Sequence, residues 1–185
     1  MVILEKKYLF SPEDEFQYLD LSDFSSIIDA FERRIVGWFL KPIEQLLGDD
    51  NNLFVITAIE CMLVDALGGF WFGKDTTGND FKTFLVDRLN IRHDIADAFY
   101  KRFRNGILHQ TSIKKKSVIS KDVLDFHLDD DVLFFNPESL HDRLKEYFRI
   151  YLVELRSGDS CVQEFKKRFK QLFKDEFRDY QWRHW

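Results

Sequence analysis

The sequence predicts an all-α fold, a helical bundle of about six to seven helices with a small β-hairpin inserted at about residues 117–136. Three observations support this prediction. The chain has 185 residues, the size of one domain, so we expect a single unit over residues 1–185. Hydrophobic residues make up 45% and aromatic residues 16%, with only 8 Gly and 3 Pro, which excludes disorder and a turn-dense β-sandwich. Apolar residues also recur at helical spacing through most of the chain.

The first predicted helix begins near Asp23 or Ser25, because either side chain can cap it. Pro42 then either kinks this helix or starts a short new one, since proline lacks the amide hydrogen that a helix interior needs. The apolar positions of this helix recur every three to four residues: Ile27, Ile28, Phe31, Ile35, Trp38 and Phe39.

The second predicted helix starts at Leu53 and is the most apolar segment of the chain. It ends at one of the glycines that follow: Gly68, Gly69 or Gly73. The segment is about long enough to span a bilayer, but it carries Glu60 and Asp65, so we interpret it as a buried central helix and expect no membrane association. Glu60 is either a paired buried carboxylate or a support for the candidate site at His109.

Asn79 or Asp80 can cap a third helix, and a fourth runs from about Asp94 toward His109. After Lys121 the apolar period changes from helical to two, which is typical of a strand. The alternating apolar residues of this strand are Leu124, Phe126 and Leu128. Three aspartates at 129–131 then predict a turn into a second strand over 132–135, and together these strands form the hairpin.

Asn136-Pro137 predicts the start of the next helix, as a cap followed by a proline in the first helical position. Gly158 ends that helix, and Ser160 with Gln163 predicts a capping box for the last one. The apolar stripe of the last helix comprises Val162, Phe165, Phe169, Leu172, Phe173 and Phe177. Its opposite side is either a solvated face or a surface for RNA or a protein partner: Lys166, Lys167, Arg168, Lys170 and Lys174.

The formal net charge is −5 and the pI is about 5.6, so any site for a polyanion must be local. Cys61 and Cys161 are far apart, which predicts neither a disulfide framework nor a zinc site, and we expect both to be buried. The apolar start of the chain is too short for a secretory signal, so we expect a cytoplasmic protein. Nucleotide-binding and hydrolase motifs are absent from the sequence, so no cofactor is expected.

Two possible metal motifs are rejected. His93-Asp94 is similar to the paired residues of metal phosphohydrolases, but the sequence has no second histidine and distal aspartate at a suitable spacing. The three aspartates at 129–131 lack the ligand order and the glycine of a calcium-binding loop. We therefore expect no metal site.

One segment, residues 98–121, indicates chemistry. It contains seven cationic side chains and no acidic one within an acidic protein, which predicts a local site for an anion. The cations are Lys101, Arg102, Arg104, Lys114, Lys115, Lys116 and Lys121. The alternative is a solvated basic turn.

A helical-wheel projection at about 100° per residue separates two sides of this segment. Phe103 and Ile107 lie on the core side, whereas Arg102, Asn105 and His109 point away from it. Leu108 is apolar but lies off the core stripe, which indicates a second buried surface such as a helix-to-helix dimer contact.

Arg104, Asn105 and His109 form an R-x4-H arrangement with a polar residue directly after the arginine. In this arrangement the chain resembles the HEPN superfamily, helical-bundle domains found in many prokaryotic toxin and defence ribonucleases. The resemblance implies metal-independent RNA cleavage, with His109 as general acid/base, Arg104 as the group that stabilises charge on phosphorus, and Asn105 as a positioning residue. The ordinary pKa of histidine is near neutral, which suits proton transfer. The planar guanidinium of arginine matches the oxygens of a phosphate. The remaining cations of the segment would bind the substrate: Lys101, Arg102, Lys114, Lys115 and Lys116.

Arg104 and His109 are separated by about 140° on an ideal helix, so they do not naturally converge on one phosphate. Either the helix distorts at Gly106 or two chains contribute. The resemblance implies the second answer, a homodimer with motif residues of both subunits facing a shared groove. It also implies a possible protein antitoxin as partner. Regulation by tyrosine modification is not expected, because Gln110-Thr111 follow the histidine where the paired toxins carry x-Tyr.

The second reading belongs to another class of function. A catalytically silent helical module would bind RNA or a protein partner through the basic segment and the last helix, since a fold of this kind does not by itself establish catalysis.

Overall fold

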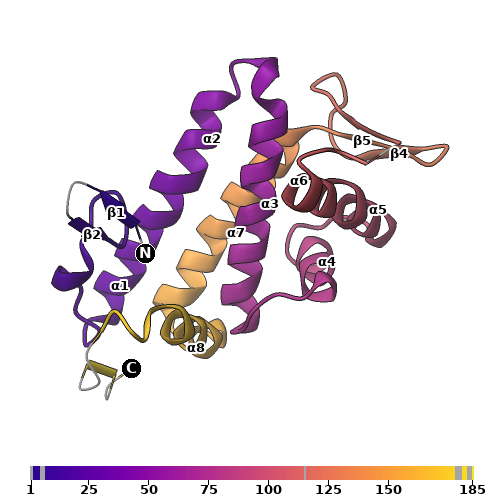
Figure 1. Cartoon of the computed structure of the whole chain (residues 1–185). Helices are drawn as coiled ribbons and strands as arrows, with labels where there is room; N and C mark the ends of the chain where they lie inside the picture. Colours follow the sequence, from indigo (N-terminus) through magenta and orange to yellow (C-terminus); the bar gives the residue numbers. More distant parts are fainter. Residues whose placement is uncertain (1, 5–6, 115, 178–180, 183–184) are drawn as a thin grey trace.

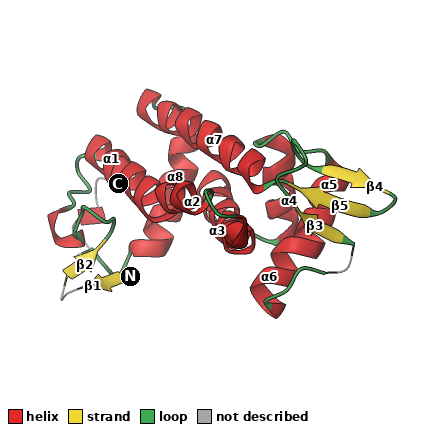
Figure 2. Ribbon diagram, turned by 90° about the horizontal axis from the view of Figure 1, so that it is seen from above, coloured by secondary structure: helices red, strands yellow, loops and turns green. Residues whose placement is uncertain are grey.

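The computed structural model describes residues 2–4, 7–114, 116–177, 181–182 and 185. The chain is mostly helical, with a three-stranded sheet at one end of the bundle and a two-stranded hairpin at the other (Figures 1 and 2). The expected helical bundle with a small β insertion is confirmed at this level.

Helix α1 (Phe24–Ile35) is capped by the carboxylate of Asp23, which accepts from the Ser26 amide at 3.1 Å. It continues through a π-helical turn, η2 (Val36–Leu40), into α2 (Lys41–Leu46). Pro42 cannot donate a hydrogen bond to the preceding turn and its ring crowds that turn, which accounts for the wider π turn directly before it. A short 3-10 turn, η3 (Asp50–Asn52), leads into the next helix.

Helix α3 (Leu53–Phe72) runs through the middle of the molecule, and Gly73 ends it in the left-handed conformation at φ 66°. By length and composition it is the one described helix that could cross a membrane, yet more than half of that window, 56%, is buried by the rest of the chain. This burial is typical of the core helix of a soluble protein.

Helix α4 (Gly78–Asp87) begins with a capping box between Thr77 and Asp80, so the cap lies two residues before the earlier of the expected positions. The single helix expected from Asp94 to His109 is interrupted. It consists of α5 (His93–Phe99), a π-helical turn η4 (Tyr100–Arg104) and α6 (Asn105–Gln110), which ends at Thr111 in the left-handed conformation.

The hairpin insertion is confirmed between β4 (His127–Asp129) and β5 (Val132–Phe135). Asp130 and Asp131 form its two-residue turn with φ of 41° and 67°, the positive values that a hairpin turn needs. Two details of the prediction were wrong. Leu124 lies outside the strand and is 96% exposed, and a third strand, β3 (Ser117–Ile119), pairs with β5 in parallel.

Helix α7 (Pro137–Ser157) starts at the predicted cap, where Asn136 Oδ1 accepts from the Glu138 amide at 3.0 Å. Gly158 ends it at φ 79°. Helix α8 (Cys161–Phe173) carries the expected phenylalanine stripe, but the predicted capping box is absent, because the Ser160 side chain makes no capping hydrogen bond and its backbone is already helical.

The first residues of the chain form a strand pair that the sequence analysis did not predict. Strands β1 (Val2–Leu4) and β2 (Lys7–Leu9) are antiparallel, and a 3-10 turn, η1 (Phe16–Tyr18), follows. Phe10 and Phe16, next to this hairpin, contact Phe173 of α8 and so join the hairpin region to the bundle.

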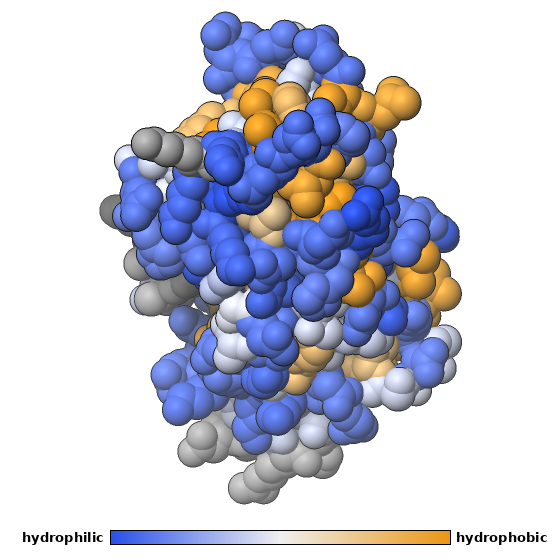
Figure 3. Space-filling view, turned by 90° about the vertical axis from the view of Figure 1, so that its right-hand side faces the viewer, coloured by the Kyte–Doolittle hydropathy of each residue, from blue (hydrophilic) through white to orange (hydrophobic). Residues whose placement is uncertain are grey.

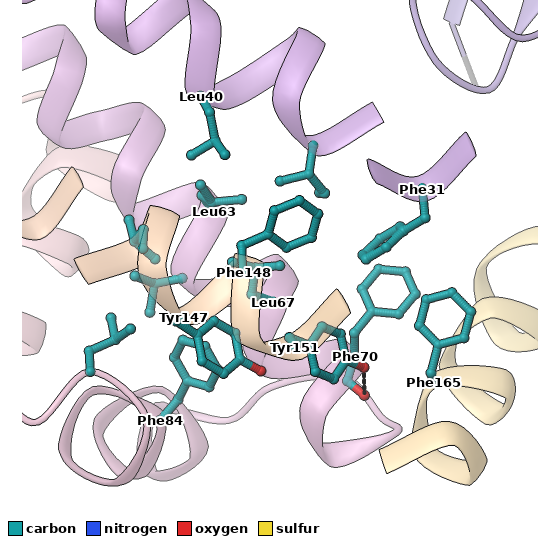
Figure 4. Packing of buried hydrophobic residues seen from close by; sticks show 14 of the residues in the cluster. Phe31, Leu40, Leu63, Leu67, Phe70, Phe84, Tyr147, Phe148, Tyr151 and Phe165 are labelled. Carbon is teal, nitrogen blue, oxygen red and sulfur yellow. Dashed lines mark hydrogen bonds between the residues drawn. The ribbon is translucent and has the colours of Figure 1, made fainter. Parts of the chain in front are cut away.

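The core is dense in aromatic rings. Around Phe165 of α8 lie Phe31 of α1 and Phe70 of α3, with ring centroids 5.1 and 5.2 Å away (Figure 4). The hydroxyl of Tyr151 from α7 donates to the Phe70 carbonyl at 3.4 Å. Cys61 and Cys161 are both buried free thiols, as expected. These contacts tie α1, α3, α7 and α8 into one core, against which α4, α5 and α6 pack.

Candidate functional site

Arg104 and His109 meet within a single chain. Nη1 of Arg104 lies 3.3 Å from Nε2 of His109, and the same nitrogen donates to Oδ1 of Asn105 at 3.3 Å. The two side chains meet although an ideal helix separates their positions by about 140°, and Gly106, the site of one of the two alternatives, lies within α6. The π-helical turn η4 ends at Arg104 and residues Asn105–Gln110 form α6, so the long arginine side chain itself spans the angle to His109. A second chain is therefore not required to bring the pair together.

The guanidinium of Arg104 is held from α3. Its Nε and Nη2 donate to one oxygen of Asp65 at 3.1 and 2.9 Å, and Thr76 donates to the other oxygen at 2.9 Å. The Arg104 and Asp65 side chains are each 21% exposed, so this ion pair is largely shielded from water. The sequence analysis noticed Asp65 only as a charge in an apolar helix and did not assign it to the site.

The contact between Arg104 and His109 can be a hydrogen bond in one tautomer of the histidine. Arginine can only donate, so Nε2 of His109 accepts from Arg104 in the tautomer that carries its proton on Nδ1. His109 is exposed at the surface, whereas Arg104 is partly covered by the Tyr100 ring, whose centroid lies 5.6 Å from the guanidinium carbon. An imidazole that is open to solvent beside a fixed cation is suited to take a proton from a bound hydroxyl group.

The chain that follows α6 turns back against it. The Ser112 amide donates to the Gly106 carbonyl at 3.3 Å, and the Lys114 amide donates to the Arg102 carbonyl in the π turn at 3.1 Å. A Cβ atom at position 106 would lie well inside van der Waals contact with the Ser112 carbonyl oxygen. Glycine at 106 is therefore needed for the close approach of residues 112–114 to α6.

The other cations of the basic segment are mostly paired with acids from outside it. Lys101 donates to Asp97 at 2.6 Å. Arg102 binds the Asp131 side chain and the backbone carbonyls of Lys116 and Asp131, and Lys116 donates to Asp131 at 2.8 Å. The hydrogen bonds from Lys116 and Arg102 lower the pKa of Asp131. These residues hold the β-hairpin turn in place.

Lys114 is exposed and pairs with no carboxylate among the described residues, whereas Lys115 lies outside them. Of the five cations predicted to bind substrate, Lys114 is thus the one that the described part of the structure leaves without a salt bridge. Because acidic side chains from elsewhere pair with most of these cations, the surface around the segment is less positive than its sequence alone predicts.

Apolar side chains are exposed close to the site. Leu108, next to His109, is 38% exposed, and Met62, one helical turn before Asp65, is 49% exposed. Val55 continues the same side of α3 and is 46% exposed. Figure 3 views the molecule from the side of α5 and the three-stranded sheet, where apolar groups emerge among polar ones in the upper half. The off-stripe position of Leu108 is confirmed, and in the single chain it faces solvent.

Glu60 fits neither expected role. It is completely buried in α3, and neither carboxylate oxygen has a hydrogen-bond partner among the described residues, so it is not a paired carboxylate and does not contact His109. Burial raises its pKa well above the ordinary value for glutamate. Within the described ranges, no group of three or more His, Cys, Asp or Glu side chains could hold a metal ion.

Comparisons of the chain with family models, with characterised proteins and with solved structures find no match. Function must therefore be argued from the residues of this chain.

Proposed function

We propose that the protein is an endoribonuclease that cleaves RNA without a metal ion, with Arg104 and His109 as its catalytic residues. The observation that supports the proposal most directly is the 3.3 Å contact between the arginine and an exposed histidine. A ribonuclease of the HEPN type would need this pair, because its chemistry uses a proton-transfer group and a fixed cation.

In the proposed reaction, Nη1 of Arg104 leaves Nε2 of His109 and turns to the phosphate when substrate binds. Nε2 then accepts the proton of a ribose 2′-hydroxyl, and the resulting oxygen attacks the adjacent phosphorus. The bond from phosphorus to the 5′-oxygen breaks, and that oxygen takes a proton from water, while the proton taken from the 2′-hydroxyl stays on His109 until solvent removes it. The products are a 2′,3′-cyclic phosphate and a 5′-hydroxyl. Arg104 stabilises the negative charge that grows on the phosphoryl oxygens.

Asp65 and Asn105 would act as positioning residues. Asp65 fixes two nitrogens of Arg104, and Asn105 accepts from the third, so the guanidinium is oriented before substrate binds. Pre-orientation matters because the stabilisation of a transition state depends on donors that need not reorganise.

The proposed setting is a cytoplasmic toxin or defence system. The protein would act as a homodimer whose contact includes exposed apolar side chains such as Leu108 and Met62. Each chain would then contribute a complete Arg104–His109 pair to a shared groove. A protein antitoxin could cover the same groove.

A second candidate is a catalytically silent module that binds RNA or a protein. Its support is that Arg104 is already bonded to Asp65, Asn105 and His109, which leaves few of its donors free for a phosphate.

An RNA cleavage assay distinguishes the nuclease from the silent module. The purified protein is incubated with a structured RNA in EDTA, and the fragments are followed by gel electrophoresis. For the nuclease we expect cleavage that falls by a factor of about 100 to 10,000 in His109→Ala. His93→Ala is the matched control, because His93 is also exposed but lies at the start of α5. RNA that stays intact with the unaltered chain but is still bound would favour the silent module.

A further inference from the structure

The four lysines on the outer side of α8 and its end differ from the other cations of this acidic protein. Most other described lysines and arginines form ion pairs, for example Lys74 with Asp80, Arg143 with Asp125 and Arg156 with Asp29. The four are Lys166, Lys167, Lys170 and Lys174. No carboxylate among the described residues pairs with any of them. We call these four residues the α8 lysine face.

The α8 lysine face lies on one side of the helix. At about 100° per residue, the four positions fall within an arc of about 100°, opposite the buried Phe165 and Phe169. At about 1.5 Å per residue, the stripe is about 12 Å long. Lys167, Lys170 and Lys174 are exposed, so their ammonium groups are open to a ligand.

Trp182 and Trp185 contact the α8 lysine face. The ammonium groups of Lys166 and Lys170 lie 5.3 and 5.6 Å from the rings of Trp185 and Trp182. The indole nitrogens donate to the carbonyls of Lys166 and Lys174 at 3.0 and 3.3 Å. Because these rings already contact the helix and its lysines, the face offers positive charge rather than free aromatic surfaces.

Helix α8 is adjacent to the candidate catalytic site through one face of α3. Asp65, which holds Arg104, and Gly69 are one helical turn apart. A Cβ atom at Gly69 would meet Nε of Arg168 at 3.1 Å, so Arg168, which is about 100° around α8 from Lys167, packs against α3 there. Arg168 also donates to Asp75 at 2.6 Å, and Asp75 adjoins the Thr76 that binds Asp65. Figure 1 shows α8 below the C-terminal end of α3.

We infer that the α8 lysine face binds the phosphate backbone of a single RNA strand, as a contact separate from the Arg104–His109 site. This inference rests on the proposed ribonuclease function and adds a second contact for its substrate. Lysine is a point charge with no fixed geometry for reading bases, so binding should depend on backbone charge and not on sequence. Since no described carboxylate pairs with these lysines, their positive charge is available to phosphate groups.

The test measures how RNA binding depends on salt. Fluorescence anisotropy is recorded with a labelled single-stranded RNA of about 20 nucleotides in EDTA, from 50 to 300 mM NaCl, in a His109→Ala background that keeps the RNA intact. Each lysine that contacts a phosphate contributes about 0.7 to the slope of log affinity against log salt. We therefore expect the additional changes Lys167→Gln, Lys170→Gln and Lys174→Gln together to reduce the slope by about 2.

The matched control removes three exposed cations from the α2 and α7 side: Lys41→Gln, Lys145→Gln and Arg149→Gln. Its net charge equals that of the α8 variant, so general electrostatic attraction would change both equally. Equal slopes in the two variants, or no RNA binding at any salt, would overturn the inference. Vesicles of phosphatidylserine and phosphatidylcholine form a further arm. Lysine-dependent binding to these vesicles, with an unchanged RNA slope, would identify a lipid surface and also overturn it.

The binding arm is independent of cleavage. Failure of the proposed nuclease would appear as intact RNA in the cleavage assay, whereas failure of this inference would appear as an unchanged salt slope.

Discussion

Glu60 is a buried carboxyl group without a hydrogen-bond partner among the described residues, and burial raises its pKa. A raised pKa means that the folded chain holds a proton that the unfolded chain releases above about pH 4.3. The stability contributed by the protonated form is therefore present at low pH and is lost as pH rises toward the folded pKa. Within that window the free energy of unfolding should fall by up to about 1.4 kcal/mol per pH unit from this group alone.

Glu60→Gln removes the titration and nearly keeps the shape. We predict that the stability of this variant, relative to the unaltered chain, rises as pH increases from about 4.5 to about 8. Chemical denaturation at several pH values measures the difference. A difference that stays constant with pH would show that Glu60 is not protonated by folding.

Asp65→Asn tests the positioning of Arg104. The amide keeps the size of the side chain but loses the charge that holds the guanidinium, so we predict a fall in kcat for RNA cleavage of up to about 100-fold with a smaller change in KM. Asp94→Asn, which alters an exposed pair with Arg92, serves as control and should keep the rate. An unchanged kcat in Asp65→Asn would argue against pre-orientation of Arg104.

At the residue scale, the sequence indicated Arg104, Asn105 and His109 through the spacing of a short motif, and the structure brings their side chains together. Their catalytic role stays a prediction. Asp65 and Thr76 could not be predicted as their partners, since they come from α3 and the loop after it and reach Arg104 only through tertiary packing. The pairing of Arg102 with Asp131 was missed for the same reason. The charges counted in a short stretch of sequence do not include acidic partners from distant segments, so they overestimate the positive charge of the folded surface.

At the scale of elements, the turn between α6 and β3 depends on Gly106. We predict that Gly106→Ala costs about 1–3 kcal/mol of stability, because its methyl group would collide with the Ser112 carbonyl and displace the loop beside His109. Gly48→Ala is the control, since nothing lies within 4 Å of a Cβ atom there, and it should be neutral or slightly stabilising. Thermal unfolding of both variants measures this, and equal midpoints would contradict the close approach.

Some elements were predictable and some were not, for identifiable reasons. The caps Asp23 and Asn136 and the aspartate turn at 130–131 are local signals, and the structure confirms them. Strand β3 pairs in parallel with β5, more than ten residues later, so no local pattern indicates it. The π turn at Tyr100–Arg104 likewise has no simple sequence signal, although it decides where the motif residues point.

At the scale of the whole molecule, stability should depend on the aromatic core. Phe165 of α8 is fully buried against Phe31 of α1 and Phe70 of α3. We therefore predict that Phe165→Ala lowers the free energy of unfolding by about 3–5 kcal/mol. Leu124→Ala, at a side chain that is 96% exposed, should change stability by less than about 0.5 kcal/mol. Urea denaturation compares the two, and similar midpoints would contradict a core centred on Phe165.

The helical class followed from composition and period, because many apolar residues at helical spacing can be buried only by helices that pack together. The relative placement of those helices did not follow. It depends on contacts between distant segments, such as those of α8 with α1 and α3, that a one-dimensional pattern does not contain.

The most direct test of the proposed function is the chemical identity of the RNA ends. Mass spectrometry of fragments produced in EDTA should find 2′,3′-cyclic phosphates, and their yield should collapse in Arg104→Ala and in His109→Ala. It should persist in Arg102→Ala, whose side chain binds the hairpin turn. Intact RNA, or the same fragments from all three variants, would contradict a catalytic role for the Arg104–His109 pair.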